Sequence, residues 1–241
     1  MHELAPLPSV AVVIPSLNEE SSLAATLRSV REQGDDFVSL IIADGGSTDG
    51  TKRVAVQHGA HVVETSRRGR GCQIAEVLSQ VREDIVLILH ADMILPHGAL
   101  EQMRHWLMTH PCCPGGCLGH RFIEKRRIYR LIEWCDRRRA RRGISYGDQA
   151  QFFRRALIER HGGFPDQPIM EDLELSRRLV SLGTPAYLDC RVEVSSRRFE
   201  RLGWWRTVVT NLLLRRSYRR GGLRVCQALL QRYYHRSNDG R

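Results

Sequence analysis

Four short apolar runs in the first hundred residues constrain the fold most, because a polar loop and then a helical pattern follow each of them. The runs cover residues 10–14, 40–43, 61–63 and 85–89. Continuous β-branched runs of this length are typical of parallel strands that are buried on both faces. Their alternation with helices predicts an α/β doubly wound fold around a mostly parallel sheet, in which ligands bind beyond the carboxyl ends of the strands.

Helical patterns and turn signals extend this prediction along the chain. Asn18 is expected to cap a helix in which Leu23, Leu27 and Val30 recur at helical spacing. The second half is less regular, with strands expected at 151–154, 186–188 and 192–194. Further helices are expected over 51–58, 96–107, 156–161, 171–182, 204–218 and 223–234.

The net charge of +10 is unevenly distributed along the chain. Residues 1–120 hold 9 basic and 14 acidic side chains, a net of −5, whereas residues 121–241 hold 28 and 13, a net of +15. A basic half is typical of proteins that bind nucleic acids, anionic membranes or phosphorylated substrates.

Cysteine usage and the absence of targeting patterns predict a cytoplasmic protein. Seven cysteines at irregular spacing favour free thiols, and the first nine residues lack the pattern of a signal peptide. No apolar run approaches the roughly 20 residues that span a membrane. Residues 110–120 combine two histidines with three cysteines but lack the paired CxxC spacing of a structural zinc site, so we interpret them as a Gly/Pro-rich loop.

Two carboxylates directly follow predicted strands. Asp44 ends the second strand and opens the segment Asp-Gly-Gly-Ser-Thr-Asp-Gly, and Asp92 follows the fourth strand. A carboxylate at a strand end can accept hydrogen bonds from the edge of a base, although the same segment also suits a plain turn. Asp92 suits either a divalent cation that bridges phosphates or a helix cap. The chain lacks GxGxxG and GxxxxGK[ST], which argues against a dinucleotide site and excludes a P-loop.

Five motifs in a fixed order carry a resemblance to a known family. They are Pro-Ser-Leu-Asn-Glu-Glu at 15–20, the aspartate–glycine segment at 44–51, His-Ala-Asp at 90–92, Gly-Gly-Phe-Pro at 162–165 and Met-Glu-Asp-Leu-Glu-Leu at 170–175. From about residue 10 to 182 the chain resembles the family 2 glycosyltransferases, which have the GT-A fold. The segments at 67–71, 147–149 and 196–201 resemble a small bacterial subgroup, the arsenosugar-biosynthesis or radical-SAM/selenodomain-associated glycosyltransferases.

The resemblance implies a domain organisation and a donor site. It implies a GT-A catalytic domain at 1–200, with a nucleotide-binding half at about 9–110 and an acceptor half at about 111–200. Basic amphipathic helices then fill 201–241. The donor would be a nucleotide-sugar, and the acceptor would be a hydroxyl compound. Nucleotide-binding residues carried over from the family are Pro15, Asn18, Glu19, Asp44, Gly45, Arg70, His90 and Ala91.

The resemblance also implies a divalent cation, Mg²⁺ or Mn²⁺, at Asp92. This residue matches the last acid of the family's DxD-type metal motif, whereas His90 replaces the first acid. A neutral imidazole can hydrogen-bond a ribose hydroxyl or a metal-bound water, but it adds no negative charge. We therefore expect metal binding to be weaker than is usual in the family.

Catalytic residues are implied by the Glu-Asp motif. Asp172 matches the family's general base and Glu171 precedes it, although acids at these positions also suit the first turn of a helix. A single base with in-line attack predicts inversion at the anomeric carbon. Arg197 and Arg198 are expected to clamp the diphosphate or to form a solvated surface pair. Asp148 and Gln149 are expected to reach the sugar or the acceptor. The alternative, that they serve only the local structure, stays open for both residues.

The basic C-terminal segment leaves two interpretations open. Residues 201–220 combine tryptophans, an apolar face and flanking arginines, which is typical of a helix at an anionic membrane surface. The same pattern suits a helix that packs on the catalytic domain or on a second copy of the chain. A nucleotidyltransferase of similar fold is the alternative enzyme, although residues 15–19 lack its glycine-rich loop. Because no nucleic-acid-binding motif occurs, a nucleic-acid partner is not expected.

Overall fold

The strands of the protein form one mixed sheet. The computed structural model describes residues 7–34 and 38–234, and the side chains of these residues except at 198, 201–202 and 226–234. The strands are β1 (Val10–Ser16), β2 (Val38–Asp44), β3 (His61–Glu64), β4 (Ile85–Ile88), β5 (Met93–Ile94), β6 (Gly115–Phe122), β7 (Gln151–Arg154) and β8 (Ala186–Val194).

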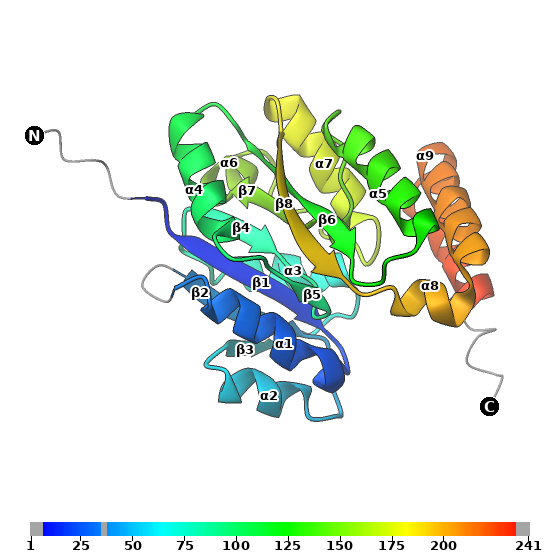
Figure 1. Ribbon diagram of the computed structural model, residues 1–241, viewed down its shortest axis with the longest axis horizontal. Coiled ribbons are helices and arrows are strands. Elements are labelled where there is room, and N and C mark those ends of the chain that lie inside the picture. The colour runs from blue at the N-terminus through cyan, green and yellow to red at the C-terminus, as the bar shows by residue number, and fades with distance from the viewer. Residues whose placement is uncertain (1–6, 35–37, 235–241) are drawn as a thin grey trace, which may run out of the picture. The chain divides into compact units, whose positions relative to one another are not determined.

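The sheet has the order β3-β2-β1-β4-β7-β6-β8-β5 (Figure 1). Strands β3, β2, β1 and β4 are parallel to one another, as predicted, and in register Val10 pairs with both Val38 and Ile85. Strand β7 is antiparallel to β4 and to β6, whereas β8 is parallel to β6. The first half is therefore a doubly wound parallel arrangement, and the predicted α/β fold class is confirmed.

Helices cover both faces of this sheet (Figure 1). The core on one face joins strand residues to α3, α6 and α7, through side chains such as Val13, Ile88, Ile74, Ile158 and Leu175. Alternate strand residues, such as Val12 and Ile14, are fully buried on the opposite face. The helices of the first unit are α1 (Glu20–Arg31), α2 (Thr51–Gln57), α3 (Arg70–Leu78), α4 (Ala99–Thr109), α5 (Arg127–Ala140), η1 (Gly147–Gln149, a 3-10 helix), α6 (Arg155–Arg160) and α7 (Glu171–Leu182).

The chain divides into two compact units, Met1–Ser195 and Ser196–Arg241. The second unit contains α8 (Arg197–Leu202) and α9 (Trp204–Tyr234). Gly222 has non-helical backbone angles, so α9 consists of two helical segments at nearly the predicted positions. None of the described helices is long and apolar enough to cross a membrane.

Three local predictions are wrong. Strand β6 begins at Gly115, inside the segment expected to be a loop, because Gly115 and Gly116 pair closely with β7. The strands expected at 186–188 and 192–194 are one strand, β8, with an irregular register where it faces Leu118 and His120. Asn18 does not cap α1; its side-chain oxygen accepts a hydrogen bond from the N–H of Thr48 at 2.9 Å.

Side-chain hydrogen bonds hold the carboxyl ends of β1 and β2 together. Gln73 in α3 is buried, and its Nε2 donates to the carbonyl oxygens of Ser16 at 3.1 Å and Ala43 at 2.9 Å. Above it, the Asn18 N–H donates to Ser47 Oγ, which joins the loop after β1 to the loop after β2. The two loops therefore form one hydrogen-bonded edge of the sheet.

Replacement of Gln73 tests this arrangement. Gln73→Met keeps a side chain of similar length but leaves two buried carbonyl groups without their side-chain donor. We expect the free energy of unfolding to fall by about 1–3 kcal/mol in urea denaturation. Gln57→Met, on the exposed side of α2, is the matched control and should change it by less than about 0.5 kcal/mol. Equal effects of the two substitutions would show that the Gln73 bridge does not stabilise the edge.

Candidate active site

The structure brings several of the predicted site residues together beyond the carboxyl ends of the strands. His90 and Asp92 follow β4, Arg70 begins α3, Asp148 lies in η1, and Glu171 begins α7 with Asp172. The carboxylates of all four acidic residues raise the pKa of Arg70, with Glu171 contributing most. Segments that are far apart in the sequence thus converge on a single guanidinium group.

Arg70 and Glu171 form an ion pair at the centre of this group. Arg70 Nε lies 3.2 Å from Glu171 Oε1, and the side chain of Glu171 is only 4% exposed. Burial raises the pKa of Glu171 to about 7, although the Arg70 guanidinium acts in the opposite direction. Gly71 permits the contact, since a Cβ there would lie 2.2 Å from the carbonyl oxygen of Gln167 and 2.7 Å from Glu171 Cβ.

His90 lies against η1. A Cβ at Gly147 would approach His90 Nε2 to 2.6 Å and Arg70 Nη1 to 3.6 Å, so only glycine leaves room for the imidazole ring. Burial and the nearby Arg70 charge together lower the pKa of His90 to about 4, although the carboxylates of Asp92, Asp148 and Asp172 act in the opposite direction. His90 is therefore neutral near pH 7 and can donate or accept a hydrogen bond without carrying charge.

Asp172 is held by backbone donors. Its Oδ2 accepts a hydrogen bond from the Gly147 N–H at 2.9 Å, and its Oδ1 accepts one from the Leu173 N–H at 2.7 Å. The carboxylate also lies in the first turn of α7, where the helix dipole favours negative charge. Gln151 Nε2 fixes the backbone below it by donating to the Asp172 carbonyl oxygen at 2.9 Å.

Asp44 lies at the end of β2 and is fully buried. Its carboxylate accepts hydrogen bonds from the N–H groups of Gly46 and Ser47 and from Ser47 Oγ. Asp44 therefore stabilises the turn after β2, which is one of the two roles that the sequence suggested. Its other suggested role, contact with a nucleotide base, stays a prediction.

The remaining nucleotide-pocket residues lie along the same edge. Pro15 is part of β1, and the Glu19 N–H donates to Thr51 Oγ1 at 2.8 Å. Ala91 is buried, and its carbonyl oxygen accepts a hydrogen bond from Thr26 Oγ1 in α1 at 2.9 Å. A Cβ at Gly45 would approach Gln73 Nε2 to 2.6 Å, so glycine is required where this turn crosses α3.

The negative charge around Asp92 suits a divalent cation, although Asp92 is not in the group of described side chains whose ligand atoms lie close enough together to hold one. Asp92, Asp148 and Asp172 all act on Arg70, as Glu171 does, so one guanidinium faces four carboxylates. When all four are ionised, three negative charges are not balanced by Arg70. Carboxylate oxygens are the ligands that Mg²⁺ and Mn²⁺ prefer.

For three further predicted residues, contact with the donor or acceptor stays a prediction. Gln149 is buried in η1, where its Oε1 accepts hydrogen bonds from the Tyr146 N–H at 3.3 Å and from Arg139 Nη2 at 3.1 Å. Arg197 is an exposed residue of the second unit, and the side chain of Arg198 lies outside the described residues. Their role at a diphosphate stays a prediction.

Sequence reasoning missed a group of side chains beside Asp148. His120 in β6 and Asp136 in α5 each bring a potential metal ligand within 4.8 Å of one another and of an Asp148 oxygen. Arg139 forms an ion pair with Asp136, and its guanidinium lies 3.8 Å from the centre of the Tyr146 ring. The local signal in the sequence is the cluster of arginines at 137–142, a pattern that suits either a solvated helix face or a mobile loop over the site.

An open α/β sheet with charged side chains beyond the carboxyl ends of its strands is the arrangement in which α/β proteins bind their ligands. Residues 11–162 match the family model of glycosyl transferase family 2. Because this match covers more than half of the chain, the protein belongs to that family. The match favours glycosyl transfer over nucleotidyl transfer. The narrower bacterial subgroup stays a prediction from the motifs.

Two curated relatives illustrate the sequence similarity. The chain is 33% identical over 121 residues to glycosyltransferase AglJ of Haloferax volcanii, an alignment that covers 49% of this chain and 38% of that protein. It is 35% identical over 98 residues to glucosyl-3-phosphoglycerate synthase of Mycobacterium tuberculosis, covering 37% and 30% respectively. The alignments therefore span less than half of these relatives.

Solved structures share the fold over more of the chain. Mannosyltransferase PcManGT from Pyrobaculum calidifontis, in complex with GDP-Man and Mn²⁺, has a TM-score of 0.67 at 21% identity, covering 96% of this chain and 76% of that one. The M. tuberculosis glucosyl-3-phosphoglycerate synthase, in complex with Mn²⁺, UDP and glucosyl-3-phosphoglycerate, has a TM-score of 0.62 at 25% identity, covering 86% and 79%. These likenesses confirm the predicted GT-A fold.

The pKa of Glu171 predicts a pH-dependent stability. Because burial raises this pKa from 4.5 to about 7, the folded protein keeps a proton that the unfolded chain has released. The free energy of unfolding should therefore fall as the pH rises between these two values, and this contribution should be absent from Glu171→Gln. We expect wild type to lose about 1–3 kcal/mol relative to Glu171→Gln between about pH 5 and pH 8, measured by urea unfolding.

The control for this measurement is Glu159→Gln. Glu159 is half-exposed and ion-paired with Arg155, so its replacement should leave the pH dependence as in wild type. Parallel pH profiles of wild type and Glu171→Gln would contradict the raised pKa of Glu171.

Proposed function

We propose that the protein transfers a glycosyl group from a nucleotide-activated donor to an acceptor hydroxyl, with inversion at the anomeric carbon. The observation that carries this proposal is the convergence of Asp92, Asp148, Glu171 and Asp172 around Arg70 at the carboxyl edge of the sheet. Ligands bind at this edge in open α/β sheets. The solved relatives with GDP-Man, or with UDP and a glucosylated product, support a nucleotide-sugar donor for this chain.

Asp172 is the general base in this proposal. Two backbone N–H groups orient its carboxylate, so one oxygen can take the proton of the acceptor hydroxyl as that oxygen attacks the anomeric carbon. A positioned base of this kind typically contributes 10²–10⁴-fold to the rate. Since a single base takes part and the attack is in line, the configuration of the anomeric carbon inverts.

Arg70 and Glu171 prepare the site for a charged donor. The buried Glu171 carboxylate holds Arg70 at 3.2 Å, which keeps a cationic group beside His90 and η1. Asp92 would hold a divalent cation, which would supply charge neutralisation for the nucleoside diphosphate. The neutral His90 ring beside it is available to hydrogen-bond a donor hydroxyl.

Asp172→Asn tests the assignment of the base. We expect turnover to fall about 10²–10⁴-fold, because asparagine cannot accept the proton. Donor affinity should stay within about threefold, because the base acts mainly in the transition state. Turnover is measured as release of UDP, GDP or dTDP from nucleotide-sugars with a panel of hydroxyl acceptors and Mn²⁺. Affinity is measured by thermal shift with the same donors, with and without Mn²⁺.

The matched control is Glu174→Gln, in the same turn of α7. Glu174 pairs with Arg177 and should keep wild-type turnover when replaced. Wild-type turnover in Asp172→Asn would remove Asp172 as the base. If wild type neither binds nor turns over any nucleotide-sugar of the panel, the proposed function itself is wrong.

The first segment of α9 supports a second proposal, that this helix binds an anionic membrane surface. Trp205, Val209 and Leu212 are exposed at helical spacing, with exposed fractions of 65%, 43% and 56%. Exposed arginines accompany this apolar stripe, at positions 206, 216, 219 and 220. An apolar face beside arginines complements the acyl chains and negative headgroups of an anionic bilayer.

Vesicle co-sedimentation tests this second proposal. Wild type should bind vesicles of phosphatidylcholine with phosphatidylglycerol more tightly than pure phosphatidylcholine, and less tightly at high salt. Trp205→Ala should weaken binding about tenfold by removing the largest side chain of the stripe. Trp106→Ala, a half-exposed tryptophan of α4, is the control and should bind as wild type does. Equal binding to both kinds of vesicle would refute the membrane role.

A further inference from the structure

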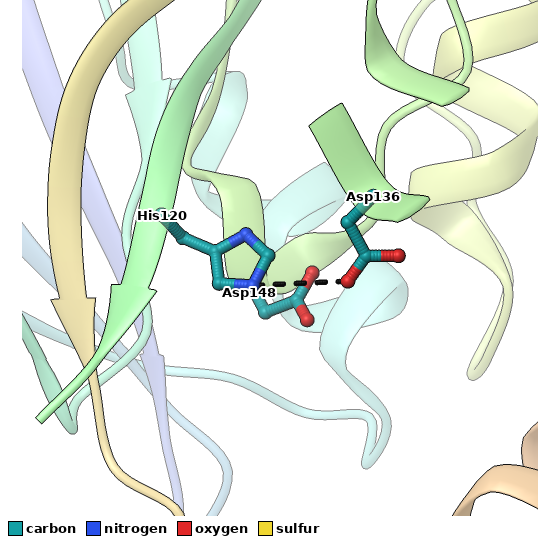
Figure 2. Close-up of side chains that lie close together, drawn as sticks. All are labelled: His120, Asp136 and Asp148. Atoms are coloured by element: carbon teal, nitrogen blue, oxygen red, sulfur yellow. Dashed lines mark ion pairs between the residues drawn. The ribbon is translucent and has the colours of Figure 1, made fainter. Parts of the chain in front are cut away.

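Three potential metal ligands meet beside the candidate active site. His120 projects from β6, Asp136 from α5 and Asp148 from η1, and Figure 2 shows the three side chains directed toward one another. One donor atom from each lies within 4.8 Å of the other two. The His120 side chain is 1% exposed and that of Asp136 is 12% exposed, whereas Asp148 is partly exposed, so protein encloses the group except on the side of Asp148.

The buried His120 ring points toward the other two side chains of this group, but its Nε2 atom forms no hydrogen bond with them. His120 Nε2 lies 3.7 Å from Asp136 Oδ2, which is too long for a hydrogen bond. Within the described part of the chain, this nitrogen has no hydrogen-bond partner. A buried polar atom without a hydrogen-bond partner is destabilising. Two ligand atoms that are each about 2.1 Å from one ion lie about 3–4 Å apart. The distance of 3.7 Å between His120 Nε2 and Asp136 Oδ2 falls in this range.

The charges of the group favour a bound cation. The ion pair between Asp136 and Arg139 balances one of the two carboxylates. The carboxylate oxygens of Asp136 and Asp148 lie within 4.8 Å of one another, so their negative charges repel when both are ionised. A cation between them would replace this repulsion with attraction and would give His120 Nε2 a partner.

We propose that His120, Asp136 and Asp148 bind a divalent transition-metal ion. One imidazole and two carboxylates suit Zn²⁺ or Mn²⁺ better than Mg²⁺ or Ca²⁺, which prefer oxygen ligands alone. This site differs from the cation expected at Asp92, because none of its three ligands belongs to the 90–92 motif, although the Asp148 carboxylate also acts on Arg70 beside Asp92. It also stands independently of the proposed glycosyl transfer, since its evidence is the geometry of the three side chains.

Asp148 connects this metal site to the candidate active site. It lies in η1 next to Gly147, whose N–H donates to the Asp172 carboxylate. An ion that joins Asp148 to β6 and α5 would fix η1 and, through it, the orientation of Asp172. His120 and Asp136 are therefore positioning residues, which act on the proposed base through η1.

Cobalt titration tests the site without any assay of glycosyl transfer. Tag-free, full-length protein is stripped with EDTA and titrated with Co²⁺, whose visible absorption reports its ligands, while equilibrium dialysis measures affinity and stoichiometry. We expect His120→Gln and Asp136→Asn each to weaken Co²⁺ binding at this site at least about tenfold. The controls are Asp92→Asn, at the other proposed site, and His97→Gln, an exposed histidine, and both should retain the absorption of this site.

Three results would overturn the proposal. They are no Co²⁺ binding by wild type, wild-type affinity in both His120→Gln and Asp136→Asn, or loss of all binding in Asp92→Asn. Circular dichroism checks that each variant folds. If neither ligand variant folds, X-ray absorption of Co²⁺-loaded Asp92→Asn decides the question. An imidazole ligand with oxygens supports the site, and a shell of oxygen atoms alone refutes it.

Discussion

The ion pair between Arg70 and Glu171 is the interaction on which the arrangement of the candidate site depends. It joins the first turn of α3, which packs against the nucleotide-binding half of the sheet, to the first turn of α7. A buried carboxylate is costly unless a cation accompanies it, and the half-exposed Arg70 supplies that cation. The close approach needs Gly71, because any larger residue would collide with the segment that precedes α7. The arginine–glycine sequence at 67–71 is thus explained by packing as well as by charge.

This contact also organises the groups around it. Arg70 and His90 both lie against Gly147, and the Gly147 N–H in turn holds Asp172. The proposed base, the neutral imidazole and the cationic group are therefore coupled through one short 3-10 helix, η1. Small movements of η1 would change all three at once, which is why its attachment to β6 and α5 bears on the proposed chemistry.

The sequence predicted the parts of the fold whose signals are local. Strands β1, β2 and β4 are continuous apolar runs because both of their faces are buried, and the carboxylates that follow them fall at one edge. Strand β6 was missed because its glycines, such as Gly115, carry no strand signal; they are required by close pairing with β7. Helix α5 was missed as an element because its arginines obscure the few buried positions, among them Asp136.

At the candidate site, too, the sequence predicted the features with local signals and missed those that depend on contacts between distant segments. Asp44 could be placed at the end of β2, but its hydrogen bonds to the turn depend on backbone geometry that no motif encodes. His120, Asp136 and Asp148 come from three elements and share no spacing, so only the folded chain brings them together. His90 replaces an acid of the family motif, which leaves Asp92 with one negative charge fewer beside it. Two carboxylates that act on Arg70 together with Asp92, those of Asp148 and Asp172, belong to the second half of the unit. The electrostatics of this edge of the sheet are therefore set partly by residues outside the 90–92 motif.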